Sequence, residues 1–317
     1  MSLVSIFTGA VLPVVVLVAV GGLLGRWREV DVDALSTVVL YVLVPALIFH
    51  SLATTTLSGP AVVKLLVGVT AFLVGMLGIA EVVGRALGGA EPLHSAFVLA
   101  AAVPNSGNFG LPLSTFAFGP TGRATAVVFL TGQSVLVYTL GVYVASRSGG
   151  VRGRAALDAV LRLPLIYAVA AAVLARWLGV VPPAGSTLMA TVKLAGDAAI
   201  PLMLLLVGIE LVNADYGGAI GRVAAADGLK LLVAPVIGLG VALALGFDDP
   251  TIAKVFVLEC ATPVAVTPLI LLVEFSEGSI GGVTAPAFLS SAVLTSTLLA
   301  VPVLTVLIAV LESGLLW

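Results

Sequence analysis

The chain has 317 residues, of which 60% are hydrophobic and 9% are charged, and its formal net charge is −2. This composition excludes a soluble domain, in which about a quarter of the residues would be charged, and it indicates a protein that crosses a membrane several times. The single cysteine, Cys260, excludes an internal disulfide and a cysteine metal cluster.

Apolar segments follow one another along the whole chain, and each is close to the roughly 20 residues that a helix needs to cross a bilayer. Short loops separate these segments. We therefore predict an all-α membrane protein with ten transmembrane helices. The predicted spans are 4–25, 34–52, 61–83, 93–118, 122–146, 163–180, 187–212, 221–246, 252–275 and 285–311.

The basic residues predict how the chain is oriented. Placing the Arg-rich segment 147–162 in the cytoplasm puts more basic residues on that side than on the other, as the positive-inside rule requires. The prediction is a multi-pass protein of the plasma membrane with both termini outside the cytoplasm. The same segment separates two repeats of five spans, 1–146 and 163–317, and an odd number of spans per repeat makes the second copy inverted.

Matched prolines support this division. Pro45 and Pro201 are separated by the same number of residues as Pro112 and Pro268, so each proline recurs at the same place in the second repeat. Inverted repeats with interrupted helices are the plan of many secondary transporters, whose substrate lies between the repeats near the middle of the membrane.

The fourth predicted span contains the polar, helix-breaking stretch 103–112, with the sequence VPNSGNFGLP. Proline and glycine disfavour a helix, and an unpaired peptide group costs several kcal/mol in hydrocarbon. Such backbone is tolerated where it lines a cavity. A simple kink is the alternative interpretation of one break, but the second break at 261–268 (ATPVAVTP) favours a site.

A helix that restarts after each break would offer free N–H groups and a positive dipole end, which suit a carboxylate. Thr267 followed by Pro268 fits an N-cap and first helical residue, whereas Leu111 before Pro112 cannot cap. We expect the Asn105 and Asn108 side chains, or the ligand, to meet the donors there. The candidate substrate-binding residues are Asn105, Ser106, Asn108, Gly110, Pro112, Gln133, Thr262, Pro263, Val264, Ala265, Thr267 and Pro268.

Ionisable residues inside predicted spans are candidates for coupling transport to protons or sodium. These residues are Asp197, Glu259, Lys193 and His50. Each has a structural alternative: Lys193 and Asp197 can neutralise one another across one helical turn, Glu259 can reach toward water, and His50 can be hydrogen-bonded at the interface. Asp227 and Lys230 lie near a predicted helix end, where solvation is the ordinary explanation. No metal or cofactor is predicted.

Six segments form one recognisable pattern: Pro104-Asn105, Gly110-Leu111-Pro112, Phe118-Gly119 and the segments 41–52, 198–208 and 261–275. Together they resemble the auxin efflux carrier family, within a superfamily that is similar to bile-acid transporters. The resemblance implies ten spans, with spans 1, 2, 6 and 7 as a scaffold and spans 3–5 and 8–10 as a transporter domain crossing at Pro112 and Pro268. It also implies an elevator motion, a small organic anion such as an auxin-like or malonate-like carboxylate, and a homodimer through the scaffold.

We therefore expect a carrier that exports or exchanges such an anion, partnered by the lipid bilayer and not by nucleic acid. The chain has no His-Glu-x-x-His, Gly-x-Ser-x-Gly or Gly-rich phosphate motif, so no enzyme is predicted. A ligand sensor or channel built on a transporter fold remains an alternative. An intramembrane aspartyl protease is the least favoured, because Gly196-Asp197 lacks the rest of that motif.

Overall fold

A computed structural model describes residues 8, 12–55, 57–147, 164–213 and 219–316 of the chain. Within these residues, six helical segments are long and apolar enough to cross a membrane: Ala34–Ala53, Gly59–Ala86, Ser106–Ala145, Thr187–Ile209, Ile220–Leu245 and Ala285–Glu312. Shorter apolar helices accompany them. The molecule is thus a multi-pass helical membrane protein, and the number of ten spans stays a prediction.

The first half of the chain alternates α-helices with single π-helical turns, which are labelled η. Wider π turns inside helices are rare and are frequent at functional sites. The elements are α2 (Leu12–Trp27), α3 (Val32–Val38), η2 (Val39–Leu43), α4 (Val44–Ala53), α5 (Gly59–Ala86), α6 (Leu93–Ala102), η3 (Ser106–Gly110), α7 (Leu111–Leu136), η4 (Val137–Gly141) and α8 (Val142–Ala145).

The second half repeats this mixture and adds one short β-hairpin, in which Ser279 pairs with Thr284 and Ile280 with Val283. The elements are α10 (Pro164–Trp177), α11 (Thr187–Asn213), α12 (Ile220–Gly228), η5 (Leu229–Val233), α13 (Ala234–Leu245), α14 (Pro250–Cys260), α15 (Thr267–Phe275), β1 (Ser279–Ile280), β2 (Val283–Thr284) and α16 (Ala285–Glu312). The predicted segment 147–162 lies almost entirely outside the described residues.

Capping residues in the local sequence mark the start of several helices. Ser58, Asp249 and Thr284 each accept a hydrogen bond from a backbone N–H in the first turn of α5, α14 and α16, and a proline follows each of them. A side-chain acceptor at the cap and a proline in the first turn are N-terminal signals of a helix, and the proline is the first residue of α14 and the second of α5 and α16. These three boundaries agree with the predicted span starts to within a few residues.

Helix α7 consists of two arms that meet where the prediction separated two spans, at residues 119–121. The chain turns sharply there at Gly119, whose φ of 60° and ψ of −144° are outside the helical region, and Pro120 follows. Only glycine adopts this backbone readily. The two arms approach so closely that a Cβ added to Gly122 would lie 2.2 Å from the carbonyl oxygen of Ser114.

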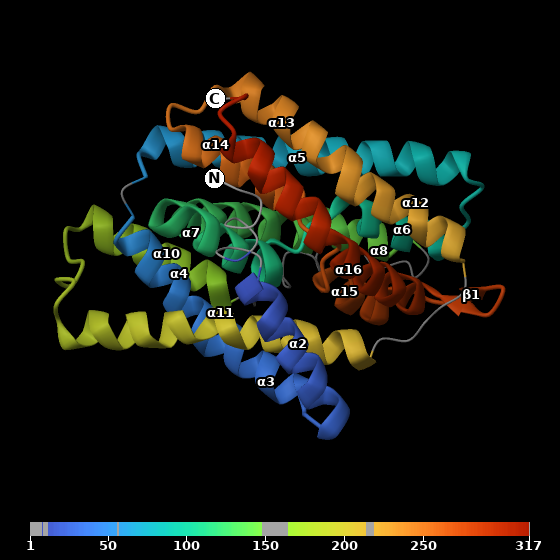
Figure 1. Cartoon of the computed structure of the whole chain (residues 1–317), viewed down its shortest axis with the longest axis horizontal. Helices are drawn as coiled ribbons and strands as arrows, with labels where there is room; N and C mark the ends of the chain where they lie inside the picture. The colour runs from blue at the N-terminus through green and yellow to red at the C-terminus, as the bar shows by residue number, and fades with distance from the viewer. Residues whose placement is uncertain (1–7, 9–11, 56, 148–163, 214–218, 317) are drawn as a thin grey trace.

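The helices form two packed groups (Figure 1). In the first group, α11 packs along α2 and α4, and α10 packs on α4. Glycines let the backbones of α2 and α11 meet: a Cβ on Gly21 would lie 2.1 Å from the Leu205 oxygen, and one on Gly208 would lie 2.0 Å from the Val18 oxygen. Small residues at helix contacts give this close approach in membranes, where no hydrophobic force drives association.

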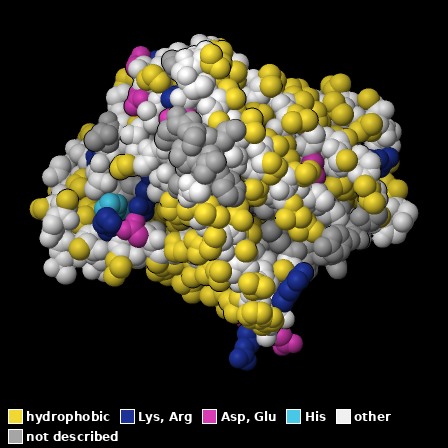
Figure 2. Space-filling view, in the orientation of Figure 1, with side chains coloured by type: hydrophobic (Ala, Val, Ile, Leu, Met, Phe, Trp, Pro, Cys, Tyr) yellow, Lys and Arg dark blue, Asp and Glu magenta, His cyan; other side chains and the backbone are white. Residues whose placement is uncertain are grey.

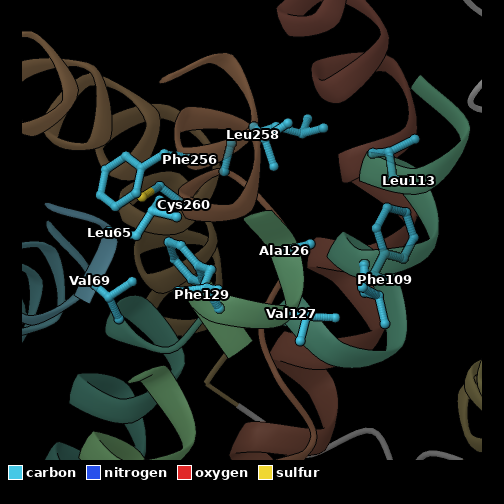
Figure 3. Close-up of a cluster of buried hydrophobic side chains, with 14 of the residues drawn as sticks. Leu65, Val69, Phe109, Leu113, Ala126, Val127, Phe129, Phe256, Leu258 and Cys260 are labelled. Atoms are coloured by element: carbon cyan, nitrogen blue, oxygen red, sulfur yellow. The ribbon is translucent and has the colours of Figure 1, made fainter. Parts of the chain in front are cut away.

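The second group contains α5–α8 and α12–α16. Its core gathers side chains of α5, η3, α7 and α14, several of which are drawn in Figure 3. Phe129 is buried at the centre, with its ring 6.5 Å from that of Phe72 and 5.5 Å from that of Phe256. The two groups meet where η3 and α7 pack against α4, α10 and α11.

Candidate functional site

The two predicted helix breaks lie side by side. Helix α6 ends at Ala102 and α14 ends at Cys260, and the extended residues that follow pair in an antiparallel bridge between Pro104 and Val264. The Asn105 N–H donates to the Pro263 oxygen over 2.8 Å, and the Ala265 N–H donates to the Val103 oxygen over 3.1 Å. The bridge therefore gives hydrogen-bond partners to four backbone groups that the broken helices would otherwise leave unpaired.

Two side chains from neighbouring helices form further hydrogen bonds with the residues of the breaks. Gln133 of α7 donates through Nε2 to the Pro104 oxygen over 2.7 Å and accepts through Oε1 from the Ser106 hydroxyl over 2.8 Å. Ser296 of α16 accepts from the Val264 N–H over 3.0 Å. Buried backbone polar groups must be paired inside a membrane protein, so neighbouring helices hold the breaks in place.

The helices restart differently from the prediction. After the first break, helical backbone begins at Ser106, not at Leu111 or Pro112, and Asn105 caps it by accepting the Asn108 N–H over 3.2 Å. Of the two asparagines expected to meet the donors there, Asn105 does so with its side chain, and Asn108 supplies the backbone donor. After the second break, α15 begins at Thr267 itself, so Thr267 does not cap the helix with its side chain as predicted.

A cavity of about 110 Å³ lies beside the two breaks, and we call it the amide pocket. The pocket lies between the two helix groups, and the first group contributes residues of η2, α4, α10 and α11 to its lining. The first N–H groups of a helix have no acceptor within the helix. At these two starts the Asn108 and Leu269 N–H groups bond to Asn105 and Val266, and Pro268 has none, so Ser106, Gly107 and Thr267 carry the backbone donors nearest the pocket. The pocket is lined by Val39, Leu40, Val44, Pro104, Asn105, Ser106, Gly107, Asn108, Leu130, Gln133, Ser134, Val137, Tyr138, Leu165, Met203, Ala265, Val266 and Thr267.

One donor in this pocket stands out. The Asn105 side chain is buried, and its Nδ2 has no hydrogen-bond partner among the described residues. A buried, unpaired amide donor costs about 1–3 kcal/mol, which a ligand acceptor would recover. No acidic side chain is among the described residues that line the pocket. The chemistry of the pocket therefore suits a small ligand that accepts hydrogen bonds.

The predicted substrate-binding residues are divided by the structure. The amide pocket brings together Asn105, Ser106, Asn108, Gln133, Ala265 and Thr267. The others are not part of the pocket lining. Thr262 is buried and its hydroxyl donates to the backbone carbonyl oxygen of Glu259, and Pro263 and Val264 form the bridge between the breaks. Gly110, Pro112 and Pro268 are not among the lining residues either.

Glu259 is fully buried below the first break. Its Oε1 accepts a hydrogen bond from the Ser114 hydroxyl over 2.6 Å, and its Oε2 has no partner among the described residues. It does not reach water from the end of its helix, as one interpretation suggested. The carboxylate occupies the space beside Gly110, where an added Cβ would lie 2.1 Å from Oε2.

Lys230 is also fully buried, so the explanation of Asp227 and Lys230 by solvation near a helix end was wrong. The Lys230 Nζ donates to the oxygen of Cys260, the last residue of α14, over 2.9 Å, and it lies 5.3 Å from the centre of the Phe72 ring. Asp227 is buried and accepts from the Thr295 hydroxyl. The lysine thus caps the negative end of the helix that leads into the second break.

Three of the four predicted coupling residues lie together, away from Glu259. Asp197 of α11 accepts from Lys193 over 2.5 Å, as the spacing of four residues predicted, and also from Arg123 of α7 over 2.6 Å. His50, Lys193 and Arg123 line a cavity of about 410 Å³, which we call the basic cavity. The lining also includes Ser51, Thr54, Thr55, Leu57, Thr115, Gly119, Pro120, Thr121 and Ala124.

Comparison with known proteins agrees with this architecture. A family model described as "membrane transport protein" matches the chain twice, over residues 6–154 and 155–308. The chain belongs to this family. This family includes the auxin efflux carriers, so the family predicted from the sequence is confirmed. The two matches meet inside the predicted segment 147–162.

Relatives of this membrane transport protein family are found in archaea. An uncharacterized transporter of Methanothermobacter thermautotrophicus is 30% identical over 272 residues, which cover 84% of this chain and 88% of the relative. An uncharacterized transporter of Methanocaldococcus jannaschii is 27% identical over 219 residues, which cover 63% and 68%. These relatives are transporters, and none of their descriptions gives a substrate.

The sequence alone missed two residues of this transporter that the geometry brings forward. Arg123 follows the sharp turn at Gly119 and meets Asp197 from a different helix, so no local spacing signals the contact. Ser114 lies one turn after Gly110 and meets Glu259 from the other half of the chain. Their signal in the sequence is only that they are polar residues within predicted apolar spans.

Proposed function

We propose that this membrane transporter is a secondary carrier for a small organic anion, such as an auxin-like or malonate-like carboxylate, which binds in the amide pocket. The observation that carries the proposal is the pairing of two broken helices at one cavity. The restarted helices η3–α7 and α15 would turn their positive ends toward the ligand. The unpaired Nδ2 of Asn105 adds a side-chain donor for a carboxylate oxygen.

The position of the pocket between the two helix groups supports alternating access. The basic cavity lies farther along the same interface: Val44 and His50 line the two cavities on α4, and Met203 and Lys193 line them on α11. These residues are six and ten positions apart, which is about 9–15 Å along a helix. Sliding α5–α8 and α12–α16 by such a distance against α2, α4, α10 and α11 would carry the pocket from one membrane face toward the other, as in an elevator.

The remaining parts of the proposal follow from the two repeats. We infer ten spans in inverted repeats, with the breaks as crossover helices, both termini outside the cytoplasm, residence in the plasma membrane and a homodimer through the scaffold. Coupling to protons or sodium would involve Glu259 below the breaks, or Asp197, Lys193 and His50 at the basic cavity. Flux that ignores both gradients would instead indicate uniport of the anion.

The test is uptake of radiolabelled carboxylates, beginning with malonate and indole-3-acetate, into proteoliposomes that contain the purified chain. We expect saturable uptake that is accelerated by unlabelled substrate on the opposite side, which separates a carrier from a channel. Asn105→Ala and Thr267→Ala should each lower uptake about tenfold, because a hydrogen bond to a charged group is worth about 1.5–3 kcal/mol.

Matched controls separate ligand binding from folding. Asp249→Ala removes the cap of α14, where Asp249 accepts from the Thr251 N–H over 2.8 Å, just as Asn105→Ala removes the cap of η3. Thr70→Ala removes a hydroxyl that only bonds to its own helix. Both controls should transport normally. Unchanged uptake in Asn105→Ala and Thr267→Ala across the carboxylates would place the site elsewhere, and binding without uptake would indicate a sensor.

A further inference from the structure

The basic cavity carries more positive than negative charge. Arg123 and Lys193 line it, and both bind one carboxylate, that of Asp197, so one positive charge remains when His50 is counted as neutral. No acidic residue is among its described lining. An unbalanced charge at a partly buried site is unfavourable unless it is paired or hydrated. The cavity is therefore predisposed to hold an anion.

Its hydrogen-bonding groups are also incompletely used. The Arg123 side chain is only 16% exposed, and two of its nitrogens, Nε and Nη2, have no partner among the described residues. The hydroxyl of Ser51, which lines the same cavity, is likewise unpartnered among them. A guanidinium with two adjacent free N–H groups is the preferred partner of a carboxylate, which it binds through two parallel hydrogen bonds.

The Arg123–Asp197 pair also joins the two helix groups. Arg123 belongs to α7 in the second group, and Asp197 belongs to α11 in the first. Among the described residues it is the only ion pair that connects them, because the others lie within one group. Any sliding of one group along the other must break this pair or carry it along.

We propose that the basic cavity is a second binding position for the carboxylate of the transported anion, which Arg123 binds through its free Nε and Nη2 while Nη1 holds Asp197. The position lies at the opposite end of the helix interface from the amide pocket, so it is where the anion waits or leaves when the pocket faces that side. The proposal rests on the carrier function, because it assumes that the anion passes along this interface. Figure 2 shows histidine, basic and acidic side chains gathered at one place on a largely hydrophobic face.

The test measures the electrostatic potential and occupancy of the cavity with a thiol at its lining. Thr54→Cys, made together with Cys260→Ala, is labelled with anionic and cationic methanethiosulfonates, and Gly185→Cys, in open space between α10 and α11, is the reference. We expect the anionic reagent to be favoured at position 54 over position 185 about tenfold. Malonate should protect position 54 from labelling, and chloride at the same ionic strength should not.

The variants decide whether the named side chains carry this effect. Arg123→Gln and Lys193→Gln should each weaken protection by malonate about tenfold or more, whereas Lys64→Gln, which removes the same charge from α5 beside Asp248, should leave it unchanged. Equal labelling by both reagents, protection by chloride as good as by malonate, or full protection in Arg123→Gln would each overturn the proposal.

Failure of the basic-cavity proposal can be distinguished from failure of the proposed carrier function. Asn105→Ala should abolish most uptake but leave protection of position 54 intact, because the two cavities are separate. Protection by malonate without uptake that depends on Asn105 would refute the amide pocket and keep the basic cavity. Uptake that depends on Asn105, with no protection at position 54, would refute the basic cavity alone.

Discussion

Replacing Gly110 with alanine tests how closely the first break is packed against α14. A Cβ at this position would lie 2.1 Å from Oε2 and 2.8 Å from Cδ of Glu259, a side chain that is fully buried and cannot swing into water. Overpacking of a filled core costs about 1–3 kcal/mol. The gain of about 1 kcal/mol from replacing glycine in a helix offsets part of this. We therefore expect Gly110→Ala to destabilise the protein by up to about 2 kcal/mol.

A neighbouring glycine provides the control. Gly107 lies in the same π turn, but a Cβ there would meet nothing closer than Leu130 Cδ1 at 3.4 Å, which is an ordinary contact. Gly107→Ala should therefore leave stability unchanged or raise it slightly. Thermal unfolding of the purified protein in detergent, followed by intrinsic fluorescence, compares the two variants. Adding Glu259→Ala removes the clash and should restore much of the stability that Gly110→Ala loses. Equal melting temperatures for the two glycine variants would refute this packing.

Two further predictions concern single contacts. Ser114→Ala removes the only described hydrogen-bond partner of the Glu259 carboxylate, so it should destabilise the protein by about 1–3 kcal/mol in the same unfolding assay, and Ser114→Thr, which keeps the hydroxyl, should lose less. Gly208→Ala should separate α2 from α11, because its Cβ would lie 2.0 Å from the Val18 oxygen, whereas Gly240→Ala has open space around it and should be tolerated. Comparable melting temperatures for the two would contradict the packing of these helices.

The sequence predicted the helix breaks because their causes are local. Pro104 and Pro263 remove backbone donors, and the glycines of 107–110 lower helix propensity, so the interruption is expected wherever the chain folds. The pairing of Lys193 with Asp197 was predictable for the same reason, since residues four apart share a helix face. The lengths of the apolar segments also placed the starts of α5, α14 and α16 to within a few residues.

Contacts between distant parts of the chain could not be predicted in this way. Arg123 and Asp197 are 74 positions apart, and Ser114 and Glu259 are 145 apart, so their meeting depends on the packing of the two halves. The failure of Thr267 as an N-cap has a similar origin. The bridge between Pro104 and Val264 fixes the path of the chain into α15, and the helix begins at Thr267, one residue earlier than the cap preference would place it.

The most direct test of the account is a disulfide between the two breaks. Pro104 and Val264 face each other as a non-hydrogen-bonded antiparallel pair, whose Cα atoms lie about 4.5 Å apart in such bridges, within the range that a disulfide spans. In a Cys260→Ala background, Pro104→Cys with Val264→Cys should cross-link under mild oxidation, and carboxylate uptake should persist because both breaks move as one unit. A pair that does not cross-link, or uptake that stops on oxidation and returns on reduction, would contradict the account.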